Sequence, residues 1–449
     1  RHLSLTVDEP SHIINGYALL RTGELWMVPL HAHPPLVNIW SALPLLLQAE
    51  RPDPRALPSW GDHFVPFLYD IVPLLGPVER VAFATRFPVM LLAVVLMALV
   101  YRWASDEFGP WGGLLAAAVM AWDPTMIAHA QLSTTDLGLT LFAFACMYLL
   151  RRRLHRPSWP LLLGAGTLMG TALATKATGL LLLPAVAAAL WPNETRAAVG
   201  GAPGRALALA HRIRPVGRWL GSVALTCAVA ALVLWVVYLF EWRALPGMSH
   251  PLPLASHIRM LESVLRQSRQ PAFLCGTLRL GGWWWYFPFV IVVKTPIPAL
   301  IALGATSVLT LRQGRPFFPL RAVALWLFPL LYLAVALGSA MNIGYRHLLP
   351  ILPFAYIALG RLGRWLAQPD PSRWQRALRG GAAALGIWYI AGTVAVYPFA
   401  LAYFNEFVGG PRNGYRYLAD SNLAWGQAFK ALQEYMDCLL YTSPSPRDS

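Results

Sequence analysis

Apolar runs separated by short polar segments cover most of this chain. The runs fall at 81–103, 111–122, 137–150, 219–240, 322–340, 347–360 and 381–399. A helical hairpin is predicted over 157–191, and a further apolar run begins at 286 and is closed by the basic residues Arg312 and Arg315. A helix needs ~20 apolar residues to cross a bilayer. The pattern therefore predicts an all-α polytopic membrane protein with about ten spanning helices.

A different pattern precedes the first of these runs. Apolar positions at Leu36, Ile39, Trp40, Leu43 and Leu47 recur every three or four residues after a Pro-Pro pair, which predicts a short amphipathic helix lying on the membrane surface. We therefore divide the chain into a first outer loop over 1–78, a helical domain over 79–400 and a C-terminal outer segment over 401–437. Long loops of this kind are usually functional.

Both ends of the chain depart from this plan. The sequence begins at Arg1 without an apolar run to carry the first loop across a membrane, so we expect a first helix to be missing. Residues 438–449 change abruptly to a polar segment rich in Ser and Pro, and we expect a non-native tail there.

Composition agrees with a membrane protein. Hydrophobic residues make up 57% of the 449 residues and charged residues 13%, outside the range of ordinary soluble domains. The net charge is +15, but the basic residues cluster between apolar runs, which indicates membrane topology and argues against nucleic-acid binding. The four cysteines are scattered and suggest neither a disulfide framework nor a metal site.

The basic clusters orient the chain in a cell membrane. Arg151-Arg152-Arg153 ends one apolar run, and such clusters favour the cytoplasmic side. Asp136 at the other end of this run then shares the outer face with Asp8. The same alternation brings further charged groups to that face: Glu9, His33, Lys176, Lys294, Arg346 and His347. A carboxylate with nearby cations suits transfer of a group from a phosphate-linked lipid, because the base activates a hydroxyl and the cations hold the leaving phosphate.

Several motifs in order carry a resemblance to a known family. They are Asp8-Glu9, His33-Pro34-Pro35-Leu36, Thr134-Thr135-Asp136, the stretch Asn342 to Pro350, Tyr403-Phe404-Asn405-Glu406, Gly409-Gly410-Pro411 and Ser421-Asn422-Leu423-Ala424-Trp425-Gly426-Gln427. Together they resemble the family 39 glycosyltransferases, membrane enzymes of the GT-C class that are similar to dolichyl-phosphate-mannose protein mannosyltransferases.

The resemblance implies a function for these residues. Asp8 is the base that activates the acceptor hydroxyl, with Glu9 in support, and His33 shapes the surface helix beside the site. The donor is a polyprenyl-phosphate sugar bound on the outer face, and the transfer inverts the anomeric centre. Arg346 is our candidate for the donor phosphate, with Tyr345 beside it and Lys294 and Arg86 behind it. The acceptor is a protein Ser or Thr, a lipid or a glycan, and a divalent cation near Asp8 is possible. Departures from the family pattern occur at Asn38, Ala424 and Ala428.

Each assignment has a structural alternative. Asp8 and Glu9 could begin a helix in a solvated loop, and Asp136 could cap the helix that starts at Leu137. Lys176 and Lys294 could extend to the membrane interface, an interpretation that the sequence favours for Lys176. The other functional hypotheses are a lipid-acceptor enzyme resembling the lipid A aminoarabinose transferases, and a transporter or flippase. Transporters carry polar groups in mid-span and often show repeats, neither of which the sequence indicates.

Overall fold

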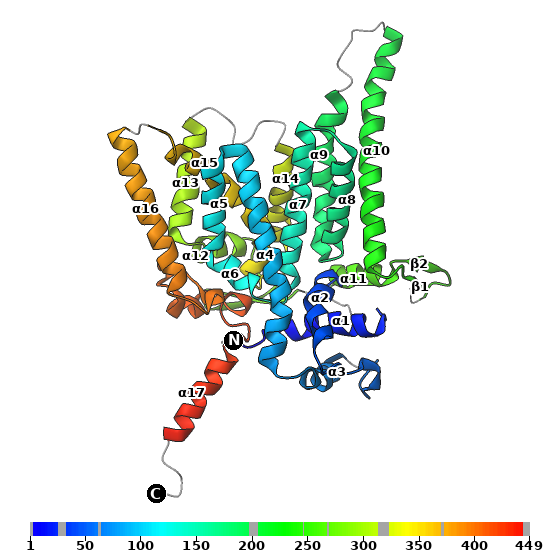
Figure 1. Cartoon of the computed structure of the whole chain (residues 1–449), viewed down its shortest axis with the longest axis vertical. Helices are drawn as coiled ribbons and strands as arrows, with labels where there is room; N and C mark the ends of the chain where they lie inside the picture. Colours follow the sequence, from blue (N-terminus) through cyan, green and yellow to red (C-terminus); the bar gives the residue numbers. More distant parts are fainter. Residues whose placement is uncertain are drawn as a thin grey trace, which may run out of the picture.

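The structure is a computed structural model, and it describes residues 3–25, 33–61, 64–196, 205–245, 247–266, 269–312, 323–369 and 372–442. Its main body is a bundle whose long helices run in roughly the same direction (Figure 1). They are α4 (Val78–Phe108), α5 (Pro110–Ala121), α7 (Thr135–His155), α8 (Trp159–Leu173), α9 (Leu182–Arg196), α10 (Arg205–Val237), α13 (Ile297–Arg312), α14 (Val323–Gly338), α15 (Leu352–Leu366) and α16 (Arg373–Val394). These helices follow the predicted apolar runs, although Arg315 lies outside the described residues.

The bundle core is built from apolar side chains and close backbone contacts. The rings of Trp103 and Phe144 lie with centroids 5.0 Å apart, and both pack edge-on against Phe354. Helices α5 and α15 approach closely at Gly112 and Gly360, where a side-chain carbon on Gly112 would lie 2.8 Å from the Gly360 carbonyl oxygen. Small residues at such crossings let helix backbones pack in a membrane, where water does not drive the helices together.

The first 78 residues contain more helix than the sequence predicts. The surface helix forms as α2 (Leu36–Ala42) and continues as a 3-10 turn, η1 (Leu43–Leu47). Two further helices, α1 (Glu9–Thr22) and α3 (Phe64–Ile71), accompany it, with 3-10 turns η2 (Pro54–Ala56) and η3 (Val72–Leu75). Ile13, Ile14 and Tyr17 of α1 are fully buried, so this part has an apolar core of its own.

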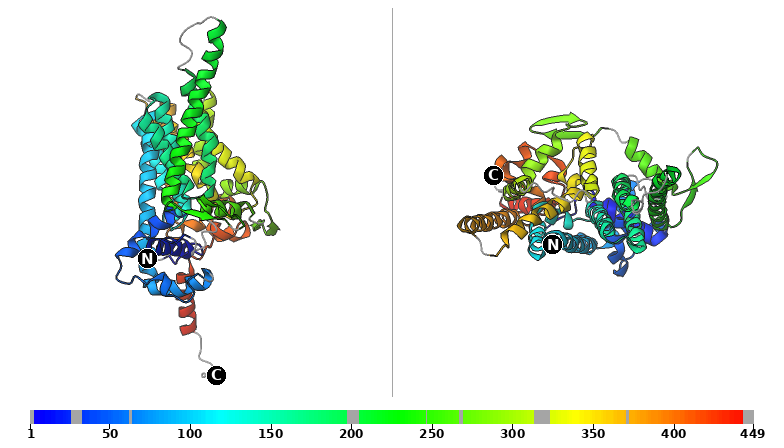
Figure 2. Two further views of the ribbon diagram at one scale, coloured as in Figure 1. Left: turned by 90° about the vertical axis from the view of Figure 1, so that its right-hand side faces the viewer. Right: turned by 90° about the horizontal axis from the view of Figure 1, so that it is seen from above.

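Short elements gather at the same end of the bundle as α1 (Figures 1 and 2). They include α6 (Pro124–Ala130), α11 (Ala255–Arg266) and α12 (Tyr286–Lys294). The loop between α10 and α12 also forms two antiparallel hairpins, β1 (Trp242–Ala244) with β2 (Pro251–Pro253) and β3 (Pro271–Leu274) with β4 (Thr277–Leu280). The all-α prediction is therefore correct for the bundle and wrong for this loop.

The C-terminal part returns to that end as a series of 3-10 turns. They are η7 (Ala400–Ala402), η8 (Glu406–Val408), η9 (Pro411–Arg416) and η10 (Asp420–Asn422), followed by α17 (Phe429–Thr442). In Figure 1, α17 extends away from the bundle. Of the tail that the sequence sets apart at 438–449, residues 443–449 lie outside the described part.

The predicted count of ten spans is not confirmed. Among the described residues, α4 and the Pro215–Val237 part of α10 are long and apolar enough to cross a membrane. Two bent pairs raise the number to at most four, if α6 with α7 and α12 with α13 each count as one span. The pairs bend by 111° and 108°. The remaining apolar helices are shorter than the ~20 residues of a full crossing.

Candidate active site

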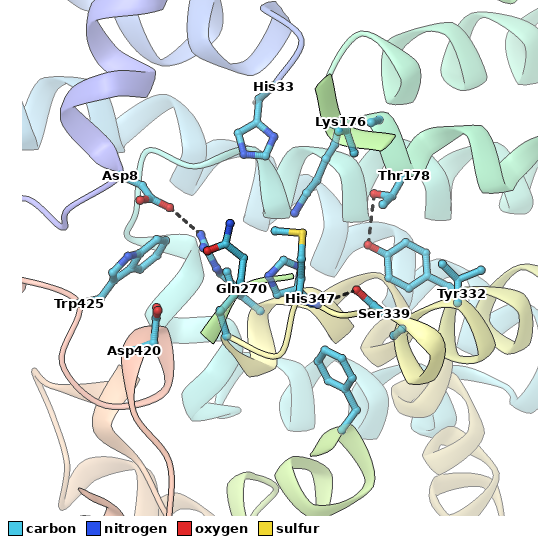
Figure 3. Close-up of a pocket in the computed structure, with 18 of the residues that line it drawn as sticks. Asp8, His33, Lys176, Thr178, Gln270, Tyr332, Ser339, His347, Asp420 and Trp425 are labelled. Carbon is cyan, nitrogen blue, oxygen red and sulfur yellow. Dashed lines mark hydrogen bonds and ion pairs between the residues drawn. The ribbon is translucent and has the colours of Figure 1, made fainter. Parts of the chain in front are cut away.

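A cavity of about 660 Å³ opens where the N-terminal segment, the turn between α8 and α9, and the C-terminal turns meet (Figure 3). Its polar and charged lining residues are Asp8, His33, Lys176, Thr178, Gln270, Tyr332, Ser339, Arg346, His347, Asp420 and Trp425. Its apolar lining includes Leu181, Phe287, Val335 and Ala336. The cavity thus offers a charged region beside an apolar wall.

Four charged side chains form a connected row in and beside this cavity. Arg346 Nη1 lies 3.0 Å from Asp8 Oδ2 and 3.9 Å from an Asp136 carboxylate oxygen, and Lys176 Nζ lies 2.5 Å from the other Asp136 oxygen. Asp8 keeps 35% of its side chain exposed, whereas Asp136 keeps 4%. Asp8 is therefore the carboxylate of this row that a molecule in the cavity can reach.

Local sequence explains how these groups are presented. Asp8 directly precedes α1, and Pro10 lies in the first turn of that helix, a position that proline favours. Asp136 lies in the first turn of α7, where a carboxylate is stabilised by the helix dipole. Lys176 follows the end of α8 at the Thr175-Lys176-Ala177-Thr178 break, immediately before the 3-10 turn η4 (Ala177–Leu181). Asp8, Asp136 and Lys176 thus lie at helix ends beside the cavity.

Two of the alternatives named for these residues are wrong. Helix α7 begins at Thr135 with Thr134 as its N-cap residue, so Asp136 does not cap the helix and its carboxylate binds Lys176 instead. Lys176 does not extend to an interface, because its side chain is 9% exposed and is held by Asp136. A lysine at the tip of an apolar hairpin usually indicates a solvated position, and the sequence contained no signal for its distant partner.

Glu9 and Arg86 form a buried pair that does not line the cavity. The Arg86 guanidinium donates to both Glu9 oxygens at 2.7 and 2.8 Å, and Glu9 also accepts from the backbone of Thr6 and Ser133. The Arg86 side chain further donates to the Ser4 carbonyl at 2.6 Å. The pair therefore ties the segment before Asp8 to α4, and this geometry suits positioning better than contact with a substrate.

Lys294 and Tyr345 also lie away from the cavity lining. Lys294 Nζ donates to the carbonyls of Leu401 and Asn422 at 2.7 and 2.6 Å and lies 4.5 Å from the centre of the Phe404 ring. The Tyr345 hydroxyl is 2.7 Å from Thr295 Oγ1. Of the predicted donor-binding cations, the structure brings only Arg346 to the cavity.

His33 lines the cavity and stacks on His12. The two ring centroids are 5.1 Å apart, and His12 Nδ1 lies 2.9 Å from Asn38 Oδ1, so Asn38 supports the stack. Burial lowers the pKa of His33 well below its usual value, and the neighbouring His12 and Lys176 lower it further. Burial also lowers the pKa of His12, against the opposing effect of Asp8. Both rings are therefore neutral at pH 7.

This histidine stack predicts acid sensitivity. Because both pKa values are lower in the folded protein than in the unfolded chain, the unfolded state binds more protons as the pH falls below about 6.5. The free energy of unfolding keeps the full contribution of the two rings above that pH and declines toward pH 5. Thermal unfolding in detergent at pH 7.5, 6 and 5 measures the slope of stability against pH. His12→Gln is expected to reduce it, and His250→Gln, at an exposed position, to leave it unchanged; equal slopes in all three proteins would contradict the explanation.

Across the described ranges, no group of three or more His, Cys, Asp or Glu side chains is arranged to hold a metal ion. Arg346 Nη1 lies 3.0 Å from Asp8 Oδ2, so this carboxylate already has a cationic partner. The divalent cation near Asp8 stays a prediction, and no step proposed below uses one.

The fold is similar to that of a solved membrane-protein structure, ArnT. The structure of ArnT from Cupriavidus metallidurans in the apo state is similar with a TM-score of 0.53 and 14% identity, over 88% of this chain and 62% of that chain. The same protein bound to undecaprenyl phosphate gives the same TM-score and identity, over 88% and 66%. The apo oligosaccharyltransferase of Archaeoglobus fulgidus has a TM-score of 0.45 and 13% identity, over 99% and 57%. The chain thus spans less than two thirds of the proteins that it matches.

The family resemblance is confirmed by a match over part of the chain. Residues 64–210 match the family model described as dolichyl-phosphate-mannose-protein mannosyltransferase. No curated protein matches the chain. The matched range includes Arg86, Asp136 and Lys176, whereas Asp8 and Arg346 lie outside it. The match bears out the predicted resemblance over this range, and the ArnT structures show a similar fold.

Proposed function

We propose that this protein transfers a sugar, mannose or another hexose, from a polyprenyl-phosphate donor to an acceptor hydroxyl. The observation that carries the proposal is the accessible Asp8 carboxylate, 3.0 Å from Arg346 and in one cavity with Lys176. The apolar wall of the cavity suits a lipid chain, and the two cations suit its phosphate. The similar ArnT structure holds undecaprenyl phosphate, a molecule of this chemistry.

The proposed reaction is a single displacement. Asp8 takes the proton of the acceptor hydroxyl, whose oxygen forms a bond to the anomeric carbon of the sugar. The bond between that carbon and the phosphate oxygen breaks, and the leaving polyprenyl phosphate keeps the electron pair. Arg346 and Lys176 stabilise this charge, because a guanidinium fork binds phosphate oxygens well and the ammonium adds a second positive charge. Attack opposite the leaving group inverts the anomeric centre.

We place the reaction on the extracytoplasmic face of a cell membrane. In α7, Asp136 lies in the first turn and the Arg151-Arg152-Arg153 cluster in the last turns, so the two groups occupy opposite ends of the helix. Arginine clusters at helix ends favour the cytoplasmic side. The end with Asp136 and the cavity then faces outward.

The acceptor is a hydroxyl on a protein or on a lipid or glycan. Labelled undecaprenyl-phosphate mannose, given to membranes that contain the full-length protein, is expected to label one of these fractions. Arg346→Gln keeps a polar side chain but removes the charge, so transfer is expected to fall about 100-fold, mainly because the leaving phosphate loses its closest cation. Arg364→Gln, on α15 outside the cavity lining, is the matched control. Unchanged transfer in Arg346→Gln, or none from any polyprenyl-phosphate hexose in the wild type, would overturn the proposal.

A further inference from the structure

Trp425 lies against the cation of the candidate site. The guanidinium carbon of Arg346 lies 4.0 Å from the centre of the Trp425 ring, and the Trp425 residue is only 5% exposed. Both side chains line the cavity, and Figure 3 shows the indole beside Asp8. An arginine over an indole face is attracted by the ring electrons, and the attraction strengthens where water is excluded.

The backbone of Trp425 is tied to the residue before Asp8. Val7 N donates to the Trp425 carbonyl at 2.9 Å, and Ser4 N donates to the Gln427 carbonyl at 3.0 Å. Trp425 N in turn donates to the Gln427 side chain at 2.6 Å. The segment that carries the indole therefore also holds the approach to Asp8.

The same segment holds the residues before Arg346. Asn422 Oδ1 accepts from Tyr345 N at 2.9 Å, and Ser421 Oγ donates to the Ile343 carbonyl at 2.8 Å. Asp8 and Arg346 lie 338 positions apart in the chain, yet the residues that precede each of them are anchored to one stretch of seven residues, 421–427. This stretch sets the relative placement of the two groups.

The hydrogen bond from Nη1 to Asp8 does not by itself fix the rotation of the Arg346 guanidinium. Its Nε is buried and has no hydrogen-bond partner in the structure, while Nη1 reaches Asp8 and, at 3.9 Å, Asp136. Without the indole face, the guanidinium could rotate to bind Asp8 through two nitrogens, a geometry that arginine and carboxylate favour. Such a pair would occupy both the proposed base and the proposed phosphate site.

We propose that Trp425 is a positioning residue: its indole holds the Arg346 guanidinium between Asp8 and Asp136 in the lining of the cavity, where the donor phosphate would bind. This inference rests on the proposed function, because it assigns Arg346 to that phosphate. Trp425 acts through Arg346 and takes no part in the bond changes.

The test measures binding of undecaprenyl phosphate to the full-length protein in nanodiscs. Trp425→Leu is expected to raise the Kd about tenfold, and Trp425→Phe, which keeps an aromatic face, less than about threefold. In an Arg346→Gln background, Trp425→Leu is expected to change the Kd less than twofold, because the cation that it positions is absent. Trp284→Leu, at an exposed tryptophan outside the cavity lining, is the matched control and is expected to bind like the wild type.

The outcomes separate the two proposals. A Kd for Trp425→Leu equal to that of the wild type overturns the positioning role, and so does an equal loss in the Arg346→Gln background. An equal loss in Trp425→Phe and Trp425→Leu also overturns it, since the ring face would then be irrelevant. A wild-type protein that neither binds undecaprenyl phosphate nor transfers sugar from it overturns the proposed function itself.

Discussion

Asp8→Asn is expected to lower sugar transfer about 10²–10⁴-fold while the donor still binds. General-base catalysis contributes rate factors of this size, and an amide cannot take the proton of the acceptor hydroxyl. The asparagine oxygen can still accept from Arg346 Nη1, as Asp8 Oδ2 does at 3.0 Å, so the arrangement of the cavity is preserved. We therefore expect kcat to fall and the Kd for undecaprenyl phosphate to change little.

Transfer of label from undecaprenyl-phosphate mannose and direct donor binding are measured on the same membranes. Asp420 supplies the other carboxylate of the cavity lining, so Asp420→Asn tests whether any cavity carboxylate can act as the base. A greater loss of transfer in Asp420→Asn than in Asp8→Asn would assign the role of general base to Asp420. Equal loss of transfer and of donor binding in Asp8→Asn would assign Asp8 to binding.

The fold was largely predictable where a local pattern decides the structure. The break at Thr175-Lys176-Ala177-Thr178 correctly predicted a turn between α8 and α9. The adjacent prolines Pro34-Pro35 correctly predicted that α2 begins at Leu36. The number of spans was not predictable in this way. Several apolar runs form helices of 12 to 16 residues, such as α5 and α14, and two others bend near the cavity. Tertiary packing, which an apolar run does not encode, determines where such helices end.

The candidate site was predictable only in part. Motif resemblance selected Asp8 and Arg346, and the structure places them in contact. It also selected Arg86 and Lys294, whose charges are satisfied by Glu9 and by backbone carbonyls away from the cavity. A cation near a site in sequence can point into the cavity or into the scaffold, and one sequence does not distinguish these orientations. The sequence does not indicate that Lys176 belongs to the site either, because its partner Asp136 is 40 residues away.

Arg86→Met is expected to lower the free energy of unfolding by about 3–5 kcal/mol, because it leaves the Glu9 charge buried without its partner. Glu9 is fully buried and Arg86 is 8% exposed, so water cannot replace the lost bonds.

Arg55→Met is the matched control: Arg55 and Glu24 also form an ion pair, but their side chains are 50% and 25% exposed, and the expected cost is at most ~1 kcal/mol. Unfolding by SDS titration measures both variants. Glu9→Gln combined with Arg86→Met should recover part of the loss, because no unpaired charge remains and the amide oxygen can still accept from Ser133 N. A loss in Arg86→Met no larger than in Arg55→Met would contradict a buried anchor, and the segment before Asp8 would then depend on its contacts with Trp425 and Gln427 alone.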